Sequence, residues 1–510
     1  MKLAAIDIGT NSIHMIIVHA SSKNQFEVLM QEKEMVKLGV GVFATNMLSE
    51  KAFHYGIDTI KRYVNLADQF GVEHIITSAT SATREAKNGR EFLDQVIAEA
   101  GLSPQLISGK EEARLIFLAV RKNIELNGEK ALVLDIGGGS TEAVVGNHQK
   151  ILFGNSMRLG VLRLLDWVGY DGPLEEKAQE DIRKYIRKKA EKIMSEATSH
   201  GFSKVIGTSG TIRSLGEACL TKGANPNPGD VNMEVVKTKD LEKLVNKLLQ
   251  VEKEKRSDIP GISSNRVEAI HLGGLLLVEL LHMAGAEEIM LSDSSLREGM
   301  IIDYLEKNAQ FLIEEPIGNS VRERSSLLLA KRYEVNLDEK RHVSGLALQL
   351  FDQLKDLHHG AAHERDILQQ ACMIYDVGLF IKFQDYHKHS RYIITNSGLR
   401  GFNNEEILLL GHMARYHRKG SPSKKQKKYR QLDKKQRKNL RLLAGILRIA
   451  VGLDKTKNQW VQNVYCIPEE KSLTIKVFGE ENMTLEIWEA QRYSDTLAKY
   501  LGLKIKILEG

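Results

Sequence analysis

The sequence predicts an α/β fold in which two related halves face a common cleft, each with a phosphate-binding hairpin. The main observation is the stretch Lys130–Glu142, where a short apolar run ends in Asp135, three glycines, two hydroxyls and Glu142. Such a run, rich in branched residues, is typical of a buried strand. Glycines after it let the backbone turn sharply and bring its N–H groups close to a bound anion. Because carboxylates can hold a divalent cation, the stretch predicts a phosphate-plus-metal loop, although a plain turn is an alternative.

The N-terminal stretch repeats this pattern. Lys2–Ser12 contains an apolar strand, then Asp7, an apolar residue, Gly9 and small polar residues. Each copy continues through a second strand, a polar turn and a third strand to a Leu-Gly pair, at residues 38–39 and 159–160. A duplication of both the loops and their downstream hairpins predicts two related half-domains.

The remaining elements follow from apolar spacing and turn residues. Helical spacing predicts helices over Ser49–Gln69, Glu175–Ser199 and Arg266–Leu280. Short apolar runs predict strands over Gly71–Thr77 and Ile289–Asp293, and a strand followed by a small-residue loop over Lys204–Thr211. A mixed tail has predicted strands near Val461–Ile467, Leu473–Phe478 and Lys504–Leu508, and a predicted helix around Ala490–Leu501.

Five strings in order carry a family resemblance. They are residues 7–12, 108–116, 135–142, 207–211 and 291–299. Two Asp-Gly hairpins on duplicated domains are similar to the superfamily of actin, sugar kinases and heat-shock chaperones. The strings together resemble the exopolyphosphatase/guanosine pentaphosphate phosphatase (Ppx/GppA) family in its long form, over essentially the whole chain.

The resemblance implies a four-part architecture. Two actin-like (ribonuclease H-like) phosphatase domains would span residues 1–125 and 126–304, with an interdomain cleft. An α-helical HD-like domain would span residues 305–447, and a small α+β C-terminal domain residues 448–510. The polar segment Asn123–Glu129 marks the first boundary.

The candidate catalytic residues are Glu112 and Arg84. Ser108 and Glu111 have the spacing of a capping box, which leaves Glu112 free to face the cleft. The family resemblance implies that Glu112 is the catalytic base and that Arg84 contacts phosphate. By residue type alone, exposed acids at a helix start and an arginine paired with a nearby acid are competing interpretations.

The other site residues cluster at the glycine-rich loops and at the start of a predicted helix. The predicted phosphate-binding residues are Gly9, Thr10, Asn11, Ser12, Gly137, Gly138, Gly139, Ser140, Thr141, Ser209, Gly210, Thr211 and Arg266. The predicted ligands of Mg²⁺, or of another divalent cation, are Asp135, Glu142 and Asp7. A plain strand–helix turn is the competing interpretation at residues 207–211.

Composition limits the class of protein. An apolar content of 42% excludes a disordered chain. Three scattered cysteines, Cys219, Cys372 and Cys466, argue against a disulfide framework or zinc site and fit a reducing compartment. No apolar run approaches the length of a membrane span, and the first residues lack a signal-peptide pattern. We therefore expect a cytoplasmic protein with no membrane association.

Cations crowd together between residues 415 and 448. The predicted polyanion track comprises Arg415, Arg418, Lys419, Lys424, Lys425, Lys427, Lys428 and Arg430. A solvated helix face is an equally good interpretation. Basic runs often bind nucleic acid, but Tyr429 is the lone aromatic residue suited to base stacking, so we expect no nucleic acid and favour a phosphate chain.

The helical region resembles metal-dependent phosphohydrolases named for a His-Asp pair. The residues that carry this resemblance are His342, Tyr375, Asp376, His387, His389, His412, His417 and Asp454. Tyr375 stands where the histidine of the pair is expected. Because a metal site needs its full set of ligands, we expect a helical scaffold with a vestigial site. Its histidines, with Arg391, Arg415, Arg418 and Lys419, are alternatively the lining of an anion channel.

These motifs predict an exopolyphosphatase, a hydrolase of acid anhydrides that processively releases orthophosphate from the end of inorganic polyphosphate with Mg²⁺. Hydrolysis of the 5′-terminal phosphate of guanosine pentaphosphate (pppGpp) by the same machinery is the alternative. An actin-like kinase or ATPase, or a polyphosphate-binding protein without turnover, is less favoured, since no stretch supplies an adenosine pocket. We expect a homodimer.

Overall fold

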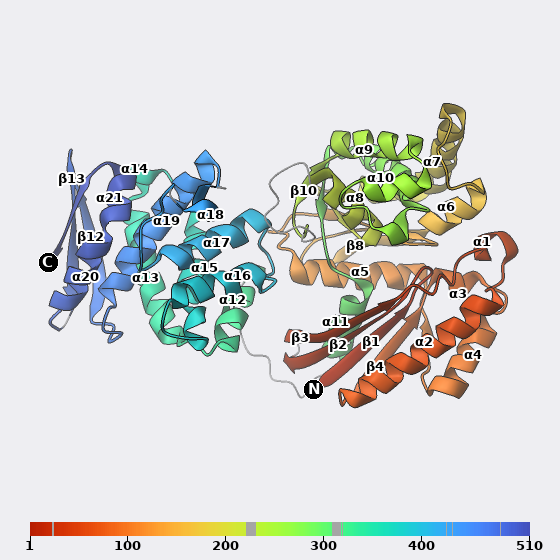
Figure 1. The fold of residues 1–510 in the computed structure, drawn as a ribbon, viewed down its shortest axis with the longest axis horizontal. Coiled ribbons are helices and arrows are strands. Elements are labelled where there is room, and N and C mark those ends of the chain that lie inside the picture. The colour runs from red at the N-terminus through yellow and green to blue at the C-terminus, as the bar shows by residue number, and fades with distance from the viewer. Residues whose placement is uncertain are drawn as a thin grey trace. The chain divides into compact units, whose positions relative to one another are not determined.

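The computed structural model describes residues 1–22, 25–220, 231–308, 318, 320–424, 426–430, 432–479 and 481–510. The chain forms two compact units, Met1–Pro316 and Ile317–Gly510 (Figure 1). No helix within the described ranges is both long and apolar enough to cross a membrane.

The first unit contains two sheets that share one strand order. The first sheet has the order β3-β2-β1-β4-β5, and the second, read in the same sense, has the order β8-β7-β6-β9-β11-β10. In both, the first three strands form an antiparallel meander, and the next two strands run parallel to the first strand. This repeated topology confirms the predicted duplication of an actin-like half-domain.

The strands of this unit are β1 (Lys2–Ile8), β2 (Ile13–Ser22), β3 (Gln25–Glu34), β4 (His74–Ala79), β5 (Gln105–Leu106), β6 (Ala131–Ile136), β7 (Thr141–Gly146), β8 (Ile151–Met157), β9 (Lys204–Thr208), β10 (Val235–Lys237) and β11 (Glu288–Leu291). Its helices are α1 (Val42–Thr45), α2 (Glu50–Gln69), α3 (Ser81–Glu85), α4 (Gly89–Ala100), α5 (Gly109–Asn123), α6 (Val161–Val168), α7 (Glu176–Ser199), α8 (Gly210–Leu220), α9 (Thr238–Gln250), η1 (Lys253–Asp258), η2 (Ser264–Arg266), α10 (Ile270–Met283) and α11 (Leu296–Asn308).

Apolar alternation along the strands sends side chains to both faces of each sheet. Along β1, Ala4, Ile6 and Ile8 pack against α2 and α4, while Leu3 and Ala5 pack against α5 and α11. The apolar core around α5 and α11 also receives residues of β6 and β7 from the second sheet. Helix α5 therefore lies between the two sheets (Figure 1), which places its N-terminal residues at their junction.

The predicted boundary at 304/305 falls inside a helix. Helix α11 continues to Asn308 and packs on α5 and β1 of the first unit. The apolar residues Ile301, Ile302 and Leu305 are buried in that contact. The boundary predicted at 304/305 from the change to a helical pattern therefore lies a few residues before the end of α11.

The second unit combines helices with a three-stranded sheet of order β12-β13-β14. Its elements are α12 (Val321–Arg332), α13 (Leu337–Gln353), α14 (Lys355–His358), α15 (Ala362–Ile374), η3 (Val377–Phe380), α16 (Tyr386–Asn396), α17 (Asn404–Tyr416), α18 (Lys427–Arg430), α19 (Lys434–Leu453), β12 (Val461–Pro468), β13 (Ser472–Gly479), α20 (Thr484–Tyr493), α21 (Asp495–Leu501) and β14 (Lys504–Glu509).

One hydrophobic core runs through this whole unit. It joins buried residues of α13, α15 and α17 to those of β12, β13 and β14, with α19 in contact with α13, α20 and α21. The predicted boundary at 447/448 is wrong for this reason, because it divides α19. The single helix predicted around residues 490–501 is two helices, which meet at Ser494.

Glutamine side chains cover both edges of the small sheet. On β12, the Gln353 amide donates to the Val464 carbonyl (2.7 Å) and accepts from the Cys466 N–H (2.9 Å). On β14, the Gln491 amide donates to the Ile505 carbonyl (3.0 Å) and accepts from the Ile507 N–H (2.8 Å). Each amide pairs with the backbone as a neighbouring strand would, so it protects an edge that another chain could otherwise extend.

We expect Gln353→Ala to lower the free energy of unfolding of the second unit by about 1–2 kcal/mol, because two backbone hydrogen bonds on β12 are lost. It should also promote association through the uncovered edge. Chemical denaturation and light scattering would measure these effects. Gln462→Ala, an exposed change on the same strand, should stay within about 0.5 kcal/mol of wild type. Equal effects of the two variants would contradict the edge-capping role.

Candidate active site

Two hairpins of the same design face each other in the first unit. The Gly9 N–H donates to the Ser12 carbonyl (3.1 Å), and the Gly137 N–H donates to the Ser140 carbonyl (2.9 Å). A Cβ added at Gly138 would lie 3.0 Å from Thr10 Cβ of the opposite hairpin. Only glycine lets the two backbones approach this closely without displacing a side chain.

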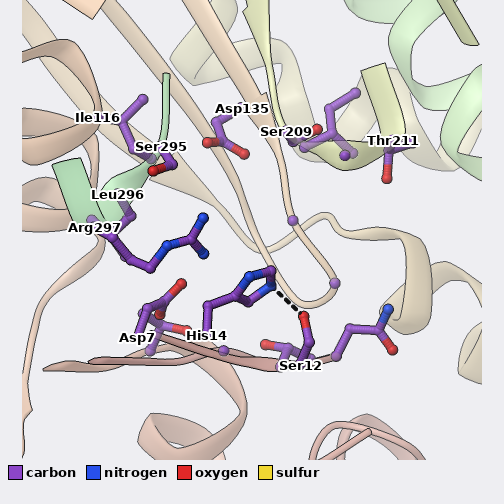
Figure 2. Close-up of a pocket in the computed structure, with 18 of the residues that line it drawn as sticks. Asp7, Ser12, His14, Ile116, Asp135, Ser209, Thr211, Ser295, Leu296 and Arg297 are labelled. Carbon is purple, nitrogen blue, oxygen red and sulfur yellow. Dashed lines mark hydrogen bonds between the residues drawn. The ribbon is translucent and has the colours of Figure 1, made fainter. Parts of the chain in front are cut away.

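A cavity of about 500 Å³ lies between the hairpins (Figure 2). Almost all of the residues predicted to bind phosphate line it: Gly9, Thr10, Asn11, Ser12, Gly137, Gly138, Gly139, Ser140, Ser209, Gly210, Thr211 and Arg266. The predicted metal ligands Asp7, Asp135 and Glu142 line it too, as does Glu112. Residues far apart in the sequence therefore contribute to one site.

Thr141 is the exception among the predicted phosphate ligands. It is fully buried, and its hydroxyl donates to the Leu159 carbonyl at 2.7 Å. The hydroxyl therefore holds the turn after β8 against the start of β7 instead of facing the cavity. The prediction failed because alternation along a strand sends Ser140 and Thr141 to opposite sides.

Four carboxyl groups face the cavity with little access to water. Burial raises the pKa of Asp7 to about 6, although Arg297 offsets part of the effect. Burial also raises the pKa of Asp135 well above its usual value, and the charges of Glu142 and Asp7 add to this. The pKa of Glu142 is raised by burial too, against hydrogen bonds from Ser156 and Ser140. The site therefore favours positive charge, either protons or a cation.

The donor set fits a divalent cation that is only partly coordinated by protein. Asp7 Oδ1 is buried and has no hydrogen-bond partner. Within the described ranges, no three His, Cys, Asp or Glu side chains form a metal-binding group. Asp7, Asp135 and Glu142 thus do not make a preformed cage. Mg²⁺ commonly keeps several waters and completes its octahedron with one or two carboxylates and substrate phosphates.

Positive side chains line the same cavity. They are Lys33, Arg213, Arg266 and Arg297. Burial and the charge of Arg213 lower the pKa of Arg266, and burial lowers the pKa of Arg297 despite the nearby Asp7. Burial makes both guanidinium charges costly, and the charge of Arg213 adds to the cost for Arg266, so an anion in the cavity would stabilise them.

Of these groups, only Arg266 was predicted from the sequence as a site residue. The prediction did not include Lys33, Arg213, Arg297 or the nearby His14. Signals for two of them were present. Arg297 lies within the string 291–299, and His14 lies two residues after Ser12, where strand alternation places it on the same face. His14 also pairs directly with Asp7 across the β1–β2 ladder.

Glu112 lies in the first turn of α5, beside Arg84. Burial raises the pKa of Glu112 well above its usual value, the charge of Glu142 adds to this, and Arg84 offsets part of it. Glu112 Oε2 is buried without a hydrogen-bond partner and lies 3.7 Å from Arg84 Nη1. Arg84 donates to the Ile107 carbonyl (2.6 Å) and is not among the residues that line the cavity. Arg84 therefore contacts the candidate base Glu112, and it does not reach the cavity where phosphate is expected to bind.

The predicted capping box at α5 is only half present. The Ser108 hydroxyl accepts from the Glu111 N–H at 3.2 Å, as expected. The Glu111 carboxylate, however, accepts two hydrogen bonds from the Arg114 guanidinium, at 2.8 and 2.7 Å. A charged partner one turn further along the helix outcompetes the backbone N–H. The result for Glu112 is unchanged, since Glu111 turns away from the cavity.

In the second unit, a lysine occupies the centre of the candidate His-Asp site. The buried Lys340 ammonium donates to Asp376 Oδ2 (2.5 Å), Glu339 Oε1 (2.9 Å) and the Tyr375 hydroxyl (2.9 Å). Burial disfavours the ammonium, but Asp376 and Glu339 more than offset this and raise the Lys340 pKa. The Asp376 carboxylate on which a metal would depend is therefore already neutralised. The residues present do not fit a metal.

We expect Lys340→Met to destabilise the second unit by about 3–5 kcal/mol, because Glu339 and Asp376 are left buried without their counter-charge. Lys457→Met is the matched control. Lys457 also contacts Glu339, at 2.9 Å, but its side chain is 54% exposed, so its removal should cost below about 1 kcal/mol. Urea denaturation measures both, and similar costs would contradict a central role for Lys340.

The basic segment lies in the second unit, and two of its predicted members fall outside the described parts, namely Lys425 and the side chain of Lys427. Lys424, Lys428 and Arg430 are exposed. The Arg418 guanidinium lies over the Tyr386 ring at 4.7 Å, and Lys419 lies 3.9 Å from Asp385. The charge of Arg391 lowers the pKa of Lys428, so these two cations are close neighbours.

The duplicated sheets and the two opposed hairpins define a protein of the actin-like fold class with a cavity between its hairpins. The model of the Ppx/GppA phosphatase family matches residues 16–308, and that of Ppx/GppA phosphatase domain III matches residues 321–495. The chain belongs to the Ppx/GppA phosphatase family, as its five strings predicted.

Two solved structures illustrate the similarity. A family member from Aquifex aeolicus is 28% identical with a TM-score of 0.52, over 60% of this chain and 99% of that one. An exopolyphosphatase from Cytophaga hutchinsonii is 27% identical with a TM-score of 0.56, over 60% of this chain and 98% of that one.

Proposed function

We propose that this protein is an exopolyphosphatase that releases orthophosphate from the end of inorganic polyphosphate. The observation that carries the proposal is one cavity that combines two glycine hairpins, four cationic side chains and a Glu112 carboxylate oxygen without a hydrogen-bond partner. A similar solved structure bears the name exopolyphosphatase, which supports the same activity.

In this mechanism the terminal phosphoryl group lies between the hairpins. Backbone N–H groups of residues 10–12 and 138–140 bind its oxygens, and Arg266 and Arg297 neutralise the phosphates that follow. Phosphoryl transfer depends mainly on positioning and electrostatic stabilisation, which fixed donors and arginines supply. The bond that breaks joins the terminal phosphorus to the bridging oxygen, which leaves with the shortened chain.

Glu112 acts as the general base. Its Oε2 atom has no hydrogen-bond partner and can take a proton from the attacking water. Since burial raises its pKa, Glu112 is a stronger base than an ordinary carboxylate. Arg84, at 3.7 Å, offsets part of this rise in pKa and so favours the ionised carboxylate that the reaction needs.

Asp135 and Glu142, with Asp7 beside them, are the residues that would hold Mg²⁺. The cation would supply positive charge as negative charge develops on the leaving oxygen. These carboxylates contribute by remaining ionised in its presence, while the Ser156 hydroxyl, which donates to Glu142 Oε1 at 2.7 Å, keeps that side chain in place.

One feature favours polyphosphate over pppGpp. The basic segment of the second unit suits a long polyanion, because several phosphate contacts along one chain add to its affinity.

We expect Glu112→Gln to lower kcat by about 10²–10⁴-fold while tripolyphosphate still binds, because general-base catalysis contributes that much. Glu111→Gln is the matched control, since its carboxylate pairs with Arg114 away from the cavity, and it should change kcat less than about twofold. Orthophosphate release with Mg²⁺ and equilibrium binding measure the two effects. An unchanged kcat in Glu112→Gln would remove Glu112 from the role of base.

The same assay compares long-chain polyphosphate with pppGpp. A higher kcat/KM for polyphosphate supports the proposed substrate. A higher value for pppGpp would keep the chemistry of the cavity but replace the substrate. Absence of orthophosphate release from both would overturn hydrolysis.

We expect Lys424→Gln, Lys428→Gln and Arg430→Gln together to raise KM for long-chain polyphosphate up to about tenfold, at about 0.5 kcal/mol for each exposed charge. The salt dependence of KM should weaken, since fewer counterions are released on binding. KM for tripolyphosphate should not change. Replacing three exposed lysines of α7 (Lys184, Lys188 and Lys192) with Gln is the control. Equal changes in both triple variants would contradict the track.

A further inference from the structure

His14 occupies a central place in the cavity, yet neither the hairpin motif nor the mechanism above uses it. It lies on β2 directly opposite Asp7 of β1, so both side chains point from neighbouring strands into the cavity. Figure 2 shows the imidazole between Ser12 and Arg297. Because His14 lies among the groups that would bind the substrate, it can take part in binding as well as in packing.

The contact of His14 within the hairpin is with Ser12. His14 Nε2 lies 2.6 Å from Ser12 Oγ, a short hydrogen bond between two side chains on the same side of the strand. Ser12 is only 9% exposed and lines the cavity at the end of the first hairpin. A serine hydroxyl alone rotates among three rotamers, so a fixed partner decides where its oxygen and its proton point.

The surroundings keep the imidazole neutral. Burial, followed by the charges of Arg297, Lys33 and Arg266, lowers the pKa of His14 to about 2. A neutral imidazole carries its proton on one nitrogen only. The ionised oxygens of a polyphosphate accept hydrogen bonds and donate none. The Ser12 proton reaches the substrate when His14 Nε2–H donates to Ser12 Oγ, which leaves the hydroxyl proton free to point into the cavity.

We propose that His14 is a positioning residue for phosphate binding, which holds the Ser12 hydroxyl through Nε2 so that its proton is donated to an oxygen of the bound phosphate. The proposal rests on the proposed function in one respect, that the cavity between the hairpins binds a phosphate chain. It adds a determinant of affinity that the Asp-Gly pattern of the hairpin does not contain.

The test compares two amides at position 14. The glutamine amide in His14→Gln reaches about as far from the backbone as Nε2 does, whereas the shorter amide in His14→Asn stands near the place of Nδ1. We expect His14→Asn to weaken tripolyphosphate binding by about tenfold, the loss of one hydrogen bond to a charged group. His14→Gln should stay within about threefold of wild type. Binding is measured calorimetrically on the full chain carrying Glu112→Gln, so that turnover does not interfere.

A double-mutant cycle with Ser12→Ala shows whether His14 acts through Ser12. In the Ser12→Ala background, His14→Asn should weaken binding less than about twofold further, because the hydroxyl that it positions is gone. Equal losses in the Gln and Asn variants, or losses that add fully to that of Ser12→Ala, would overturn the proposal. Thermal unfolding of the variants checks that each is folded.

The binding measurements test the role of His14, and the turnover assay tests the proposed hydrolysis, so either proposal can be rejected without the other. If wild type binds tripolyphosphate and releases no orthophosphate, the proposed hydrolysis is wrong, while a preserved difference between Gln and Asn still supports the role of His14. If hydrolysis is present and the two amides behave alike, the role of His14 is wrong and the proposed function stands.

Discussion

Four carboxyl groups share one cavity of the first unit, and positively charged side chains from other elements of that unit line the same cavity. Asp7, Glu112, Asp135 and Glu142 come from two sheets and from the helix between them. Burial raises the pKa of each group, so each stays ionised only where positive charge from the protein or a metal balances it, and otherwise binds a proton. The buried arginines of the same cavity need negative charge for the same reason, and a chain of phosphates would supply it.

The duplication explains how one fold brings these groups together. Each half contributes an acidic residue at the end of its first strand and a glycine turn after it, and the two turns pack closely enough that Gly138 has no room for a side chain. Helix α5 adds Glu112 at the junction, because its apolar residues belong to the core shared by both sheets. The same contact that stabilises the two halves therefore sets the position of the candidate base.

In the second unit, buried carboxylates are balanced by a lysine of the same unit. There the cation is part of the chain, since the Lys340 ammonium contacts Glu339, Tyr375 and Asp376 in a fully enclosed site. Tyr375 stands where a histidine is expected, and its hydroxyl accepts a hydrogen bond from this ammonium. An internal counter-charge keeps the helices together but offers no open position for chemistry, in contrast to the first unit, where cations and carboxylates surround an empty volume.

The sequence alone determined the duplication, the two hairpins, the family and most residues of the cavity, because glycine, acid and hydroxyl patterns are local and reflect backbone geometry. Tertiary structure decided the remainder. It turned Thr141 toward Leu159, placed Arg84 behind Glu112, and brought Lys33, Arg213, Arg297 and His14 to the cavity from separate elements. It also merged two expected domains into one core around α19. Strand alternation and the string 291–299 carried local signals for Thr141, His14 and Arg297. The places of Lys33, Arg213 and Arg84 depend on which side chains meet across long stretches of chain, and no local pattern records that.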